Sequence, residues 1–136
     1  MWIGVDIGGS LTKIVRESDD ELTFTTLSGT EWNAVVKYLQ EYPGAQIAAT
    51  GCGGMTLRDL LPQSIVIIDE LTSFCEGAKY FLARKDAKAE HIVCSFGTGT
   101  SIFCITEEGS HRVTGTAVGG GTLMGLANLL LGVSDF

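Results

Sequence analysis

Three short glycine-rich turns carry the residues best suited to bind phosphate. They are Gly8-Gly9-Ser10, Gly51-Cys52-Gly53-Gly54 and Gly97-Thr98-Gly99-Thr100, and each follows a run of apolar residues. Backbone N–H groups exposed in such turns can donate to phosphate oxygens, and the N-terminus of a following helix adds a favourable dipole. A glycine turn alone is also an ordinary chain reversal, so the phosphate-binding interpretation depends on the three occurring together.

Asp6 and Lys13 are charged residues on either side of the first turn. Asp6 ends the preceding apolar run, where a carboxylate can hold Mg²⁺ directly or through water, and capping of the turn is the alternative. Lys13 lies on the strand predicted after the turn, where its ammonium group can reach a phosphate as a point charge. A solvated lysine on an edge strand is the alternative for Lys13.

Further along the chain, Asp69, Glu70 and Arg112 are candidates for contact with a substrate. Asp69 and Glu70 follow the apolar run 65–68, and open α/β folds bind ligands at the carboxyl ends of their parallel strands. A carboxylate there can accept a proton from a substrate hydroxyl, or it can cap the helix that follows. Arg112 can form forked hydrogen bonds with a carboxylate or an amide, or it can lie in solvent on a strand.

Several classes of site have no motif in this sequence. The sequence contains no P-loop and no G-x-G-x-x-G that opens a helix after the first strand. His91 and His111 have no serine or cysteine partner in a recognisable catalytic motif. The cysteines form no C-x-x-C pair, which disfavours a metal site and indicates a reduced, cytoplasmic protein; they are Cys52, Cys75, Cys94 and Cys104. The last three lie in apolar runs, so we expect them to act as small hydrophobes.

The composition excludes further partners. The 136 residues include 9 Lys and Arg against 16 Asp and Glu, a net charge of −7, so neither nucleic acid nor an anionic membrane is expected as a partner. The N-terminus lacks the basic region of a signal peptide, and the apolar stretch 123–133 is too short to span a bilayer. Hydrophobic residues make up 45% of the chain, which predicts strands buried on both faces or a surface that another part covers.

The apolar patterns predict elements that hold these residues in place. Thr30 is the predicted N-cap of the first helix, which Pro43-Gly44 ends. Strands are predicted over 1–6, 11–16, 22–27, 46–50, 64–68, 91–96, 101–106 and 112–116, with 64–68 buried on both faces. Helices are predicted from Trp32 to Leu39 and over 56–61, 70–83 and 121–131.

The element pattern repeats within the chain. The order strand, glycine turn, strand, hairpin, strand, helix occurs twice, and each set of three strands is predicted to form an antiparallel meander. The polar segment 86–90 separates the two copies. We therefore predict two units, 1–86 and 87–136, of which the second ends after its first helix.

Four segments together resemble the type II (eukaryotic-like) pantothenate kinases. The segment 4–13 resembles the family's N-terminal phosphate motif, and 69–77 resembles the segment that holds its catalytic glutamate. The segment 95–102 is similar to its second glycine loop, and 112–126, with R-V-T-G-T and G-G-G-T, is similar to its longest signature. The last match is very specific, whereas D-x-G-G-[ST] occurs throughout the superfamily of acetate and sugar kinases and actin-like ATPases.

The resemblance implies a fold and a reaction. The fold is α/β: a ribonuclease-H-like (actin-like ATPase) lobe with a mixed sheet that begins as a meander, then the first part of a second similar lobe, with ATP between them. The reaction is transfer of the γ-phosphate of ATP, with Mg²⁺, to the 4′-hydroxyl of pantothenate, the first step toward coenzyme A. Charge neutralisation and in-line positioning are what such a transfer requires of a protein.

The resemblance also implies a role for each matching residue. Glu70 would be the general base, Asp6 would lie near Mg²⁺, and Ser101 and Arg112 would contact pantothenate or an acyl-CoA regulator. Phosphate contacts are implied for Gly8, Gly9, Ser10, Leu11, Thr12, Lys13 and Thr98. Nucleotide contacts are implied for Gly120, Gly121, Thr122, Leu123, Met124 and Phe136, the last against adenine.

This sequence departs from the family pattern in two ways. Ser10 stands where the family more often has threonine, and serine keeps the side-chain hydroxyl of threonine. The family's C-terminal portion, about the latter half of a bacterial member, is missing, so we expect a homodimer or association with that portion. Two alternatives stay open: another kinase or ATPase of the superfamily acting on a sugar or an acid, and a non-catalytic nucleotide- or acyl-CoA-binding module.

Overall fold

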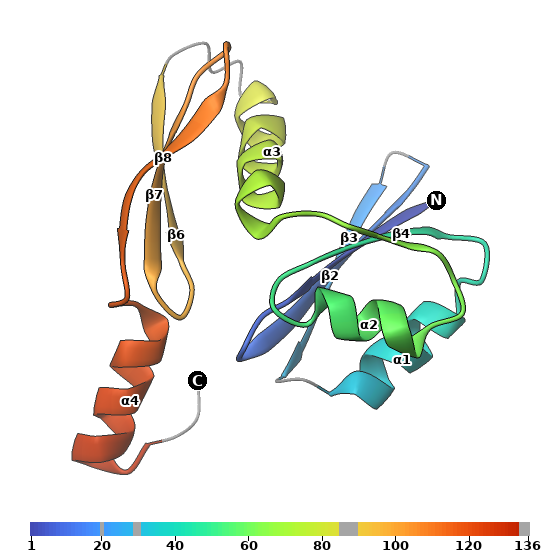
Figure 1. Cartoon of the computed structure of the whole chain (residues 1–136), viewed down its shortest axis with the longest axis horizontal. Helices are drawn as coiled ribbons and strands as arrows, with labels where there is room; N and C mark the ends of the chain where they lie inside the picture. Colours follow the sequence, from blue (N-terminus) through green and yellow to red (C-terminus); the bar gives the residue numbers. More distant parts are fainter. Residues whose placement is uncertain (20, 29–30, 85–89, 134–136) are drawn as a thin grey trace. The chain divides into compact units, whose positions relative to one another are not determined.

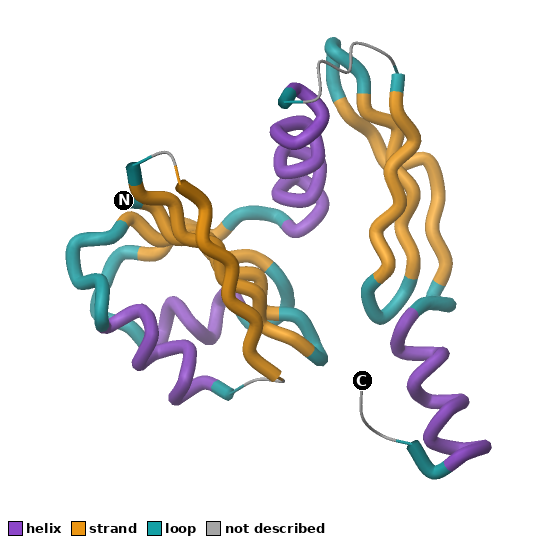
Figure 2. Tube along the Cα trace, turned by 180° about the vertical axis from the view of Figure 1, so that it is seen from behind, coloured by secondary structure: helices purple, strands orange, loops and turns teal. Residues whose placement is uncertain are grey.

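The computed structural model describes residues 1–19, 21–28, 31–84 and 90–133. Contacts between Cα atoms divide the chain into two compact units, Met1–Ser73 and Phe74–Phe136, and each is described by itself. Figure 1 shows the helices and strands, most of them labelled, and Figure 2 colours the same trace by secondary structure.

Unit 1 is built on a five-stranded mixed sheet in the order β3-β2-β1-β4-β5. The first three strands form the predicted antiparallel meander, and β4 and β5 add to it in parallel. The strands are β1 (Trp2–Ile7), β2 (Leu11–Ser18), β3 (Glu21–Ser28), β4 (Gln46–Thr50) and β5 (Ile65–Ile67). Two helices of this unit, α1 (Trp32–Gln40) and α2 (Gly54–Leu60), pack against the sheet.

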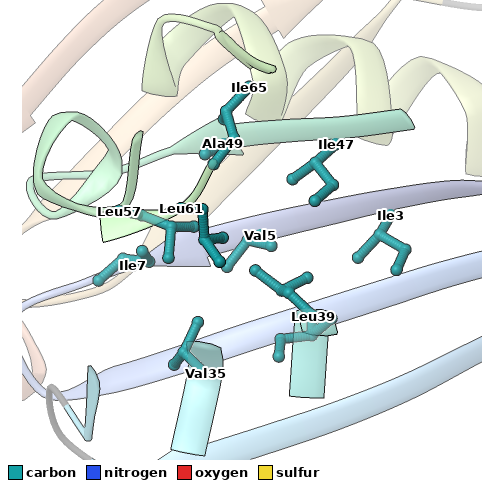
Figure 3. Close-up of a cluster of buried hydrophobic side chains, with 11 residues drawn as sticks. Ile3, Val5, Ile7, Val35, Leu39, Ile47, Ala49, Leu57, Leu61 and Ile65 are labelled. Atoms are coloured by element: carbon teal, nitrogen blue, oxygen red, sulfur yellow. The ribbon is translucent and has the colours of Figure 1, made fainter. Parts of the chain in front are cut away.

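The core of unit 1 follows from the alternating apolar residues of its strands and the helical spacing of apolar residues in its helices. Alternate residues of β1 point to one face, so that Ile3, Val5 and Ile7 are all buried. Helical spacing brings Val35 and Leu39 of α1 to that same core. Figure 3 shows these side chains converging with those of β4 and α2. Thr30, the predicted cap of α1, lies outside the described residues, and the structure has Glu31 at that position.

The prediction that 64–68 is buried on both faces is wrong. The segment does form a strand, β5, but β5 lies at the edge of the sheet and pairs with β4. Ile65 points into the core, whereas Val66 is 55% exposed and Ile67 is 36% exposed. A run of β-branched residues favours a strand, but it does not determine the place of that strand in the sheet.

Unit 2 holds a second, antiparallel sheet in the order β6-β7-β8. Its elements are β6 (His91–Phe96), β7 (Thr100–Ile105), β8 (Ser110–Thr116) and α4 (Gly120–Leu131), together with most of α3 (Glu70–Ala83). Phe103 and Ile105 are buried with Cys75 of α3, and the rings of Phe74 and Phe103 lie 5.0 Å apart between centroids. Thus α3 covers one face of this sheet.

The division between the units falls inside α3, between Ser73 and Phe74. The sequence predicts it between 86 and 87, and residues 85–89 lie outside the described residues. The difference arises because side chains of α3 from Phe74 to Leu82 pack with Val93 and Phe103. The assignment of 1–86 and 87–136 to two lobes stays a prediction.

Helix α4 is apolar and exposed. Its leucines Leu123, Leu126, Leu129, Leu130 and Leu131 are between 50% and 78% exposed, and no described residue of α4 is buried. The apolar composition predicts a surface that another part covers, and these exposed leucines fit that prediction. Cys75 and Cys104 are buried, in keeping with the prediction that they act as small hydrophobes, whereas Cys94 is exposed and does not fit it. None of the helices in the described ranges is long and apolar enough to cross a membrane.

A pair of identical substitutions tests the core of unit 1. Leu57 is 0% exposed and Leu60, on the same helix, is 49% exposed, so Leu57→Ala should lower the free energy of unfolding by about 2–5 kcal/mol. Leu60→Ala should lower it by about 1 kcal/mol or less. Denaturant titration of both variants measures the difference, and equal losses would contradict this account of the core.

Candidate functional site

Asp6 and Lys13 form an ion pair at the end of the β1–β2 hairpin. The two residues lie directly opposite each other in the antiparallel ladder, and Lys13 Nζ donates to Asp6 Oδ2 over 2.9 Å. The side chains are 35% exposed for Asp6 and 59% exposed for Lys13. The structure therefore brings together the two charged residues predicted at this turn and leaves both accessible.

The turn between these two strands is short and tight. The Gly8 N–H donates to the Leu11 carbonyl oxygen over 3.0 Å. Gly9 and Ser10 at its tip are exposed, and Leu11 is half-buried. Thr12 is fully buried below the tip, so its side chain is not accessible at the surface of the turn. The accessible part of the predicted phosphate motif is thus its tip together with Lys13.

The second glycine turn packs against the end of β1. Gly51 has a φ of +81°, and a Cβ there would lie 2.5 Å from the Ile7 carbonyl oxygen and 2.8 Å from Asp6 Oδ1. The Ile7 carbonyl oxygen accepts from the Gly53 N–H over 3.2 Å and from the Cys52 thiol over 3.4 Å. Glycine at 51 is therefore needed both for its backbone conformation and for this close approach.

Thr50 is a polar residue beside this site that lies outside the glycine motifs of the sequence. It lies directly opposite Asp6 in the parallel pair of β1 and β4. Its hydroxyl oxygen is buried and has no hydrogen-bond partner among the described residues. The position of Thr50 at the carboxyl end of a parallel strand, just before a glycine turn, is the signal that could have identified it.

Asp69 and Glu70 have different surroundings, although they are neighbours. Asp69 Oδ2 accepts from the Thr72 N–H over 2.9 Å and from the Thr72 hydroxyl over 3.0 Å, so Asp69 caps α3. These hydrogen bonds lower the pKa of Asp69. Glu70 is exposed in the first turn of α3, and its side chain forms no hydrogen bond or ion pair with any described residue. Of the two carboxylates, Glu70 is the accessible one.

In unit 2 two glycine segments lie backbone against backbone. The Gly120 N–H donates to the Gly97 carbonyl oxygen over 2.8 Å, and the Gly121 N–H donates to the Thr98 carbonyl oxygen over 3.2 Å. A Cβ on Gly119 would lie 2.6 Å from the Gly99 carbonyl oxygen. The N-terminus of α4 is thereby joined to the loop between β6 and β7, and Thr98 is exposed there. Two N–H groups of this helix end are already used within the protein.

The remaining residues predicted to contact nucleotide lie along α4. Thr122 and Leu123 are exposed in its first turn, and Met124 is half-buried. The Thr122 hydroxyl accepts from the Gly119 N–H over 3.4 Å. Phe136 lies outside the described residues.

Ser101 and Arg112 lie on one face of the sheet in unit 2. Ser101 is directly opposite Ser95 on β6 and Gly115 on β8. Arg112 is exposed, and its guanidinium lies where a side chain on Gly115 would be. Ser95 thus adds a second hydroxyl to this face, and no motif in the sequence points to it as a substrate contact. Only the strand register, which pairs Ser95 with Ser101, identifies it.

Asp6 is the candidate metal-binding group of unit 1. No three His, Cys, Asp or Glu side chains gather into a metal site in the described part of the chain. Mg²⁺ is commonly held by one or two carboxylates while it keeps waters and phosphate oxygens as other ligands. Asp6 fits that pattern, because Lys13 pairs with Oδ2 and the neighbouring Gly51 carries no side chain that would cover Oδ1.

A hollow of about 420 Å³ lies at the other end of the parallel strands of unit 1. Trp2, Pro43, Gln63 and Val66 are among the residues that line it. It contains none of the predicted site residues. The charged and glycine-rich groups lie instead where β1 and β4 end.

The whole chain was compared with known proteins. The chain is 37% identical over 139 residues to the type II pantothenate kinase of Bacillus anthracis, covering 98% of this chain and 50% of that protein. It is 32% identical over 137 residues to the same enzyme from Staphylococcus saprophyticus, covering all of this chain and 52% of that protein. This chain is homologous to type II pantothenate kinases. It spans about half the length of these curated relatives.

Solved structures define the fold of this pantothenate kinase homologue. An activator of 2-hydroxyisocaproyl-CoA dehydratase from Clostridium difficile, solved with bound ADPNP, has a TM-score of 0.68 at 17% identity and covers 96% of this chain and 52% of that one. Glucokinase from Balamuthia mandrillaris has a TM-score of 0.51 at 17% identity, and the match covers 82% of this chain and 46% of the glucokinase chain. A family model described as Fumble matches residues 90–136. The predicted fold, that of actin-like ATPases and sugar kinases, is confirmed.

The cap at Asp69 gives a prediction for stability. Asp69→Ala should lower the melting temperature at neutral pH, whereas Asp69→Asn should keep most of the cap. Because hydrogen bonds lower the pKa of folded Asp69 below its usual 3.8, its contribution is present above that pH and is lost as the pH falls through the folded-state pKa.

Thermal unfolding of both variants, followed by far-UV circular dichroism over this pH range, checks the prediction. The difference between Asp69→Ala and the unsubstituted chain should narrow in acid. A difference that stays constant from neutral pH to well below 3.8 would contradict a role for the charged carboxylate.

Proposed function

We propose that this chain supplies part of a pantothenate kinase, which transfers the γ-phosphate of ATP to the 4′-hydroxyl of pantothenate in the first step toward coenzyme A. The observation that carries the proposal is the 37% identity to a type II pantothenate kinase across 98% of the chain. Homologues named as kinases and neighbours with a kinase fold support a phosphotransferase more generally. Pantothenate as the acceptor is the finer part of the proposal.

In unit 1 we assign the general base to Glu70 and phosphate contacts to the tip of the β1–β2 turn with Lys13. The capping hydrogen bonds of Asp69 support this choice, because Glu70 is the accessible carboxylate of the two. An exposed carboxylate at the start of a helix can accept the proton that the attacking hydroxyl loses. Asp6 would hold Mg²⁺, which neutralises charge on the phosphates when bound.

In unit 2 we assign pantothenate contacts to Ser101 and Arg112, and we add Ser95 to them. The strand register supports this grouping, because Ser95, Ser101 and Gly115 are neighbours across three strands. A guanidinium and two hydroxyls match an acceptor that carries a carboxylate, an amide and hydroxyls. Thr98, the segment 120–124 and Phe136 would contact the nucleotide.

The setting of the reaction is also part of the proposal. The four cysteines are free, which supports a reducing compartment such as the cytoplasm. The exposed leucines of α4 support association with a second copy or with the part of the relatives that this chain does not cover. An acyl-CoA would act as a regulator by contacting Ser101 and Arg112.

The role of Glu70 is tested in a reconstituted kinase, meaning this chain combined with the part of a type II pantothenate kinase that it does not cover. Glu70→Gln should lower turnover by about 10²–10⁴-fold, because the hydroxyl loses its proton acceptor. ATP binding should be almost unchanged. Transfer of radiolabelled phosphate and equilibrium dialysis with ATP measure the two quantities.

Asp69→Asn is the matched control for this experiment, since asparagine keeps the helix cap and removes the neighbouring charge. It should retain near-normal turnover. Normal turnover in Glu70→Gln would overturn the assignment of the base. N-acetylglucosamine and acetate should be tested as acceptors beside pantothenate, and preferential phosphorylation of either one would contradict pantothenate as the substrate.

The chain by itself should not phosphorylate pantothenate. Phosphoryl transfer requires water to be excluded from the reacting groups, and the exposed leucines of α4 indicate a surface that lacks its cover in the described residues. We expect the purified chain to self-associate. Sedimentation together with a radiolabelled-ATP assay checks both points, and an active monomer would contradict them.

A further inference from the structure

Gly115 is a glycine inside a strand, where glycine is unfavourable unless something approaches closely. It belongs to β8, which lies at the edge of the three-stranded sheet. The glycines with positive φ in the described residues are Gly51 and Gly132, so the backbone at Gly115 could accept any residue. The requirement for glycine at 115 is therefore one of space.

The space beside Gly115 is filled by Arg112. A Cβ built on Gly115 would overlap Arg112 Nη2 and lie 3.0 Å from Arg112 Cζ. The same Cβ would also lie 2.8 Å from the Thr100 carbonyl oxygen. The guanidinium thus lies over the Cα of Gly115, against the strand.

A β-bulge makes this contact possible. Residues three apart in a regular strand point to opposite faces of the sheet, so Arg112 and Gly115 should not meet. The register of β7 and β8 pairs Phe103 with Arg112 and Ile102 with Thr114, which leaves Val113 as an extra residue. That extra residue brings Arg112 and Gly115 to the same face, and bulges commonly redirect a side chain in this way.

The bulge and the glycine together direct the guanidinium toward Ser101. Gly115 is directly opposite Ser101, and Phe103, which pairs with Arg112, is two residues further along the same face. A guanidinium over Gly115 therefore lies next to the Ser101 position. A side chain at 115 would displace the guanidinium from this position.

We propose that Gly115 is a positioning residue, which seats the guanidinium of Arg112 across β8 so that it faces a ligand together with Ser101. This inference rests on the proposed function for the identity of that ligand, which is the polar end of pantothenate. The guanidinium is a rigid fork of donors, and its binding energy depends on its orientation. Gly115 sets that orientation and does not itself touch the ligand.

The first test needs no substrate. In the unsubstituted chain, nuclear Overhauser effects should connect the Arg112 side chain with the α-protons of Gly115. The Nε–H signal of Arg112 is assigned as the signal that disappears in Arg112→Lys. In Gly115→Ala this signal should shift. Gly109→Ala is the matched control, because Gly109 lies in the same β7–β8 hairpin with open space around its Cα, and it should leave that signal unchanged.

The second test uses the reconstituted kinase. Gly115→Ala and Arg112→Lys should each raise the KM for pantothenate about tenfold or more, with the KM for ATP and kcat little changed. The double variant should be no worse than Arg112→Lys alone, because Gly115 acts through Arg112. Amide signals of Thr100 and Thr116 report whether β7 and β8 stay paired in Gly115→Ala.

The outcomes separate this inference from the proposed function. Absence of the Overhauser effects in the unsubstituted chain, or additive losses in the double variant, would overturn the positioning role. If the Overhauser effects and the Nε–H shift are present but the reconstituted kinase does not phosphorylate pantothenate, Gly115 still positions the guanidinium of Arg112, and the proposed function is wrong.

Discussion

Close contact between the β4–α2 turn and the end of β1 is the constraint on which the candidate site of unit 1 depends. One carbonyl oxygen, that of Ile7, accepts from the Gly53 N–H and the Cys52 thiol and lies against Gly51. The side chain of Ile7 is buried in the core, so the same residue joins the core to the site. Asp6, its neighbour, is thereby held at the position where Lys13 meets it.

Unit 2 uses glycine for the same physical purpose. Gly99 and Gly119 let two backbone segments touch, and the hydrogen bonds from Gly120 and Gly121 join α4 to the loop between β6 and β7. At Gly115 the space left by the absent side chain is occupied by the guanidinium of Arg112 rather than by backbone. Gly51, Gly99, Gly115 and Gly119 thus allow close approach of other groups, and Gly51 also needs its positive φ.

The two units differ in how much of their apolar surface they bury. In unit 1, residues of α1 and α2 cover one face of the sheet, and the alternate apolar residues of β1 point to that covered face. In unit 2, α3 covers one face, while Ile92 and Phe96 on β6 and the leucines of α4 are exposed. Full burial of one such side chain contributes about 1.5–3 kcal/mol. This difference is the physical basis for proposing that unit 2 has a partner.

The sequence by itself determined the elements of this protein and the identity of most candidate residues. Strand 46–50, helix 70–83 and strand 91–96 match their predicted bounds, because alternation and helical spacing are local properties of the chain. The tertiary structure alone decided which positions are buried, and so the exposure of Val66 and Cys94 could not be predicted. It also decided which neighbours share a face. The cap at Asp69, the contact of Arg112 with Gly115 and the pairing of Ser95 with Ser101 depend on register and on a bulge, which arise from residues distant in the sequence.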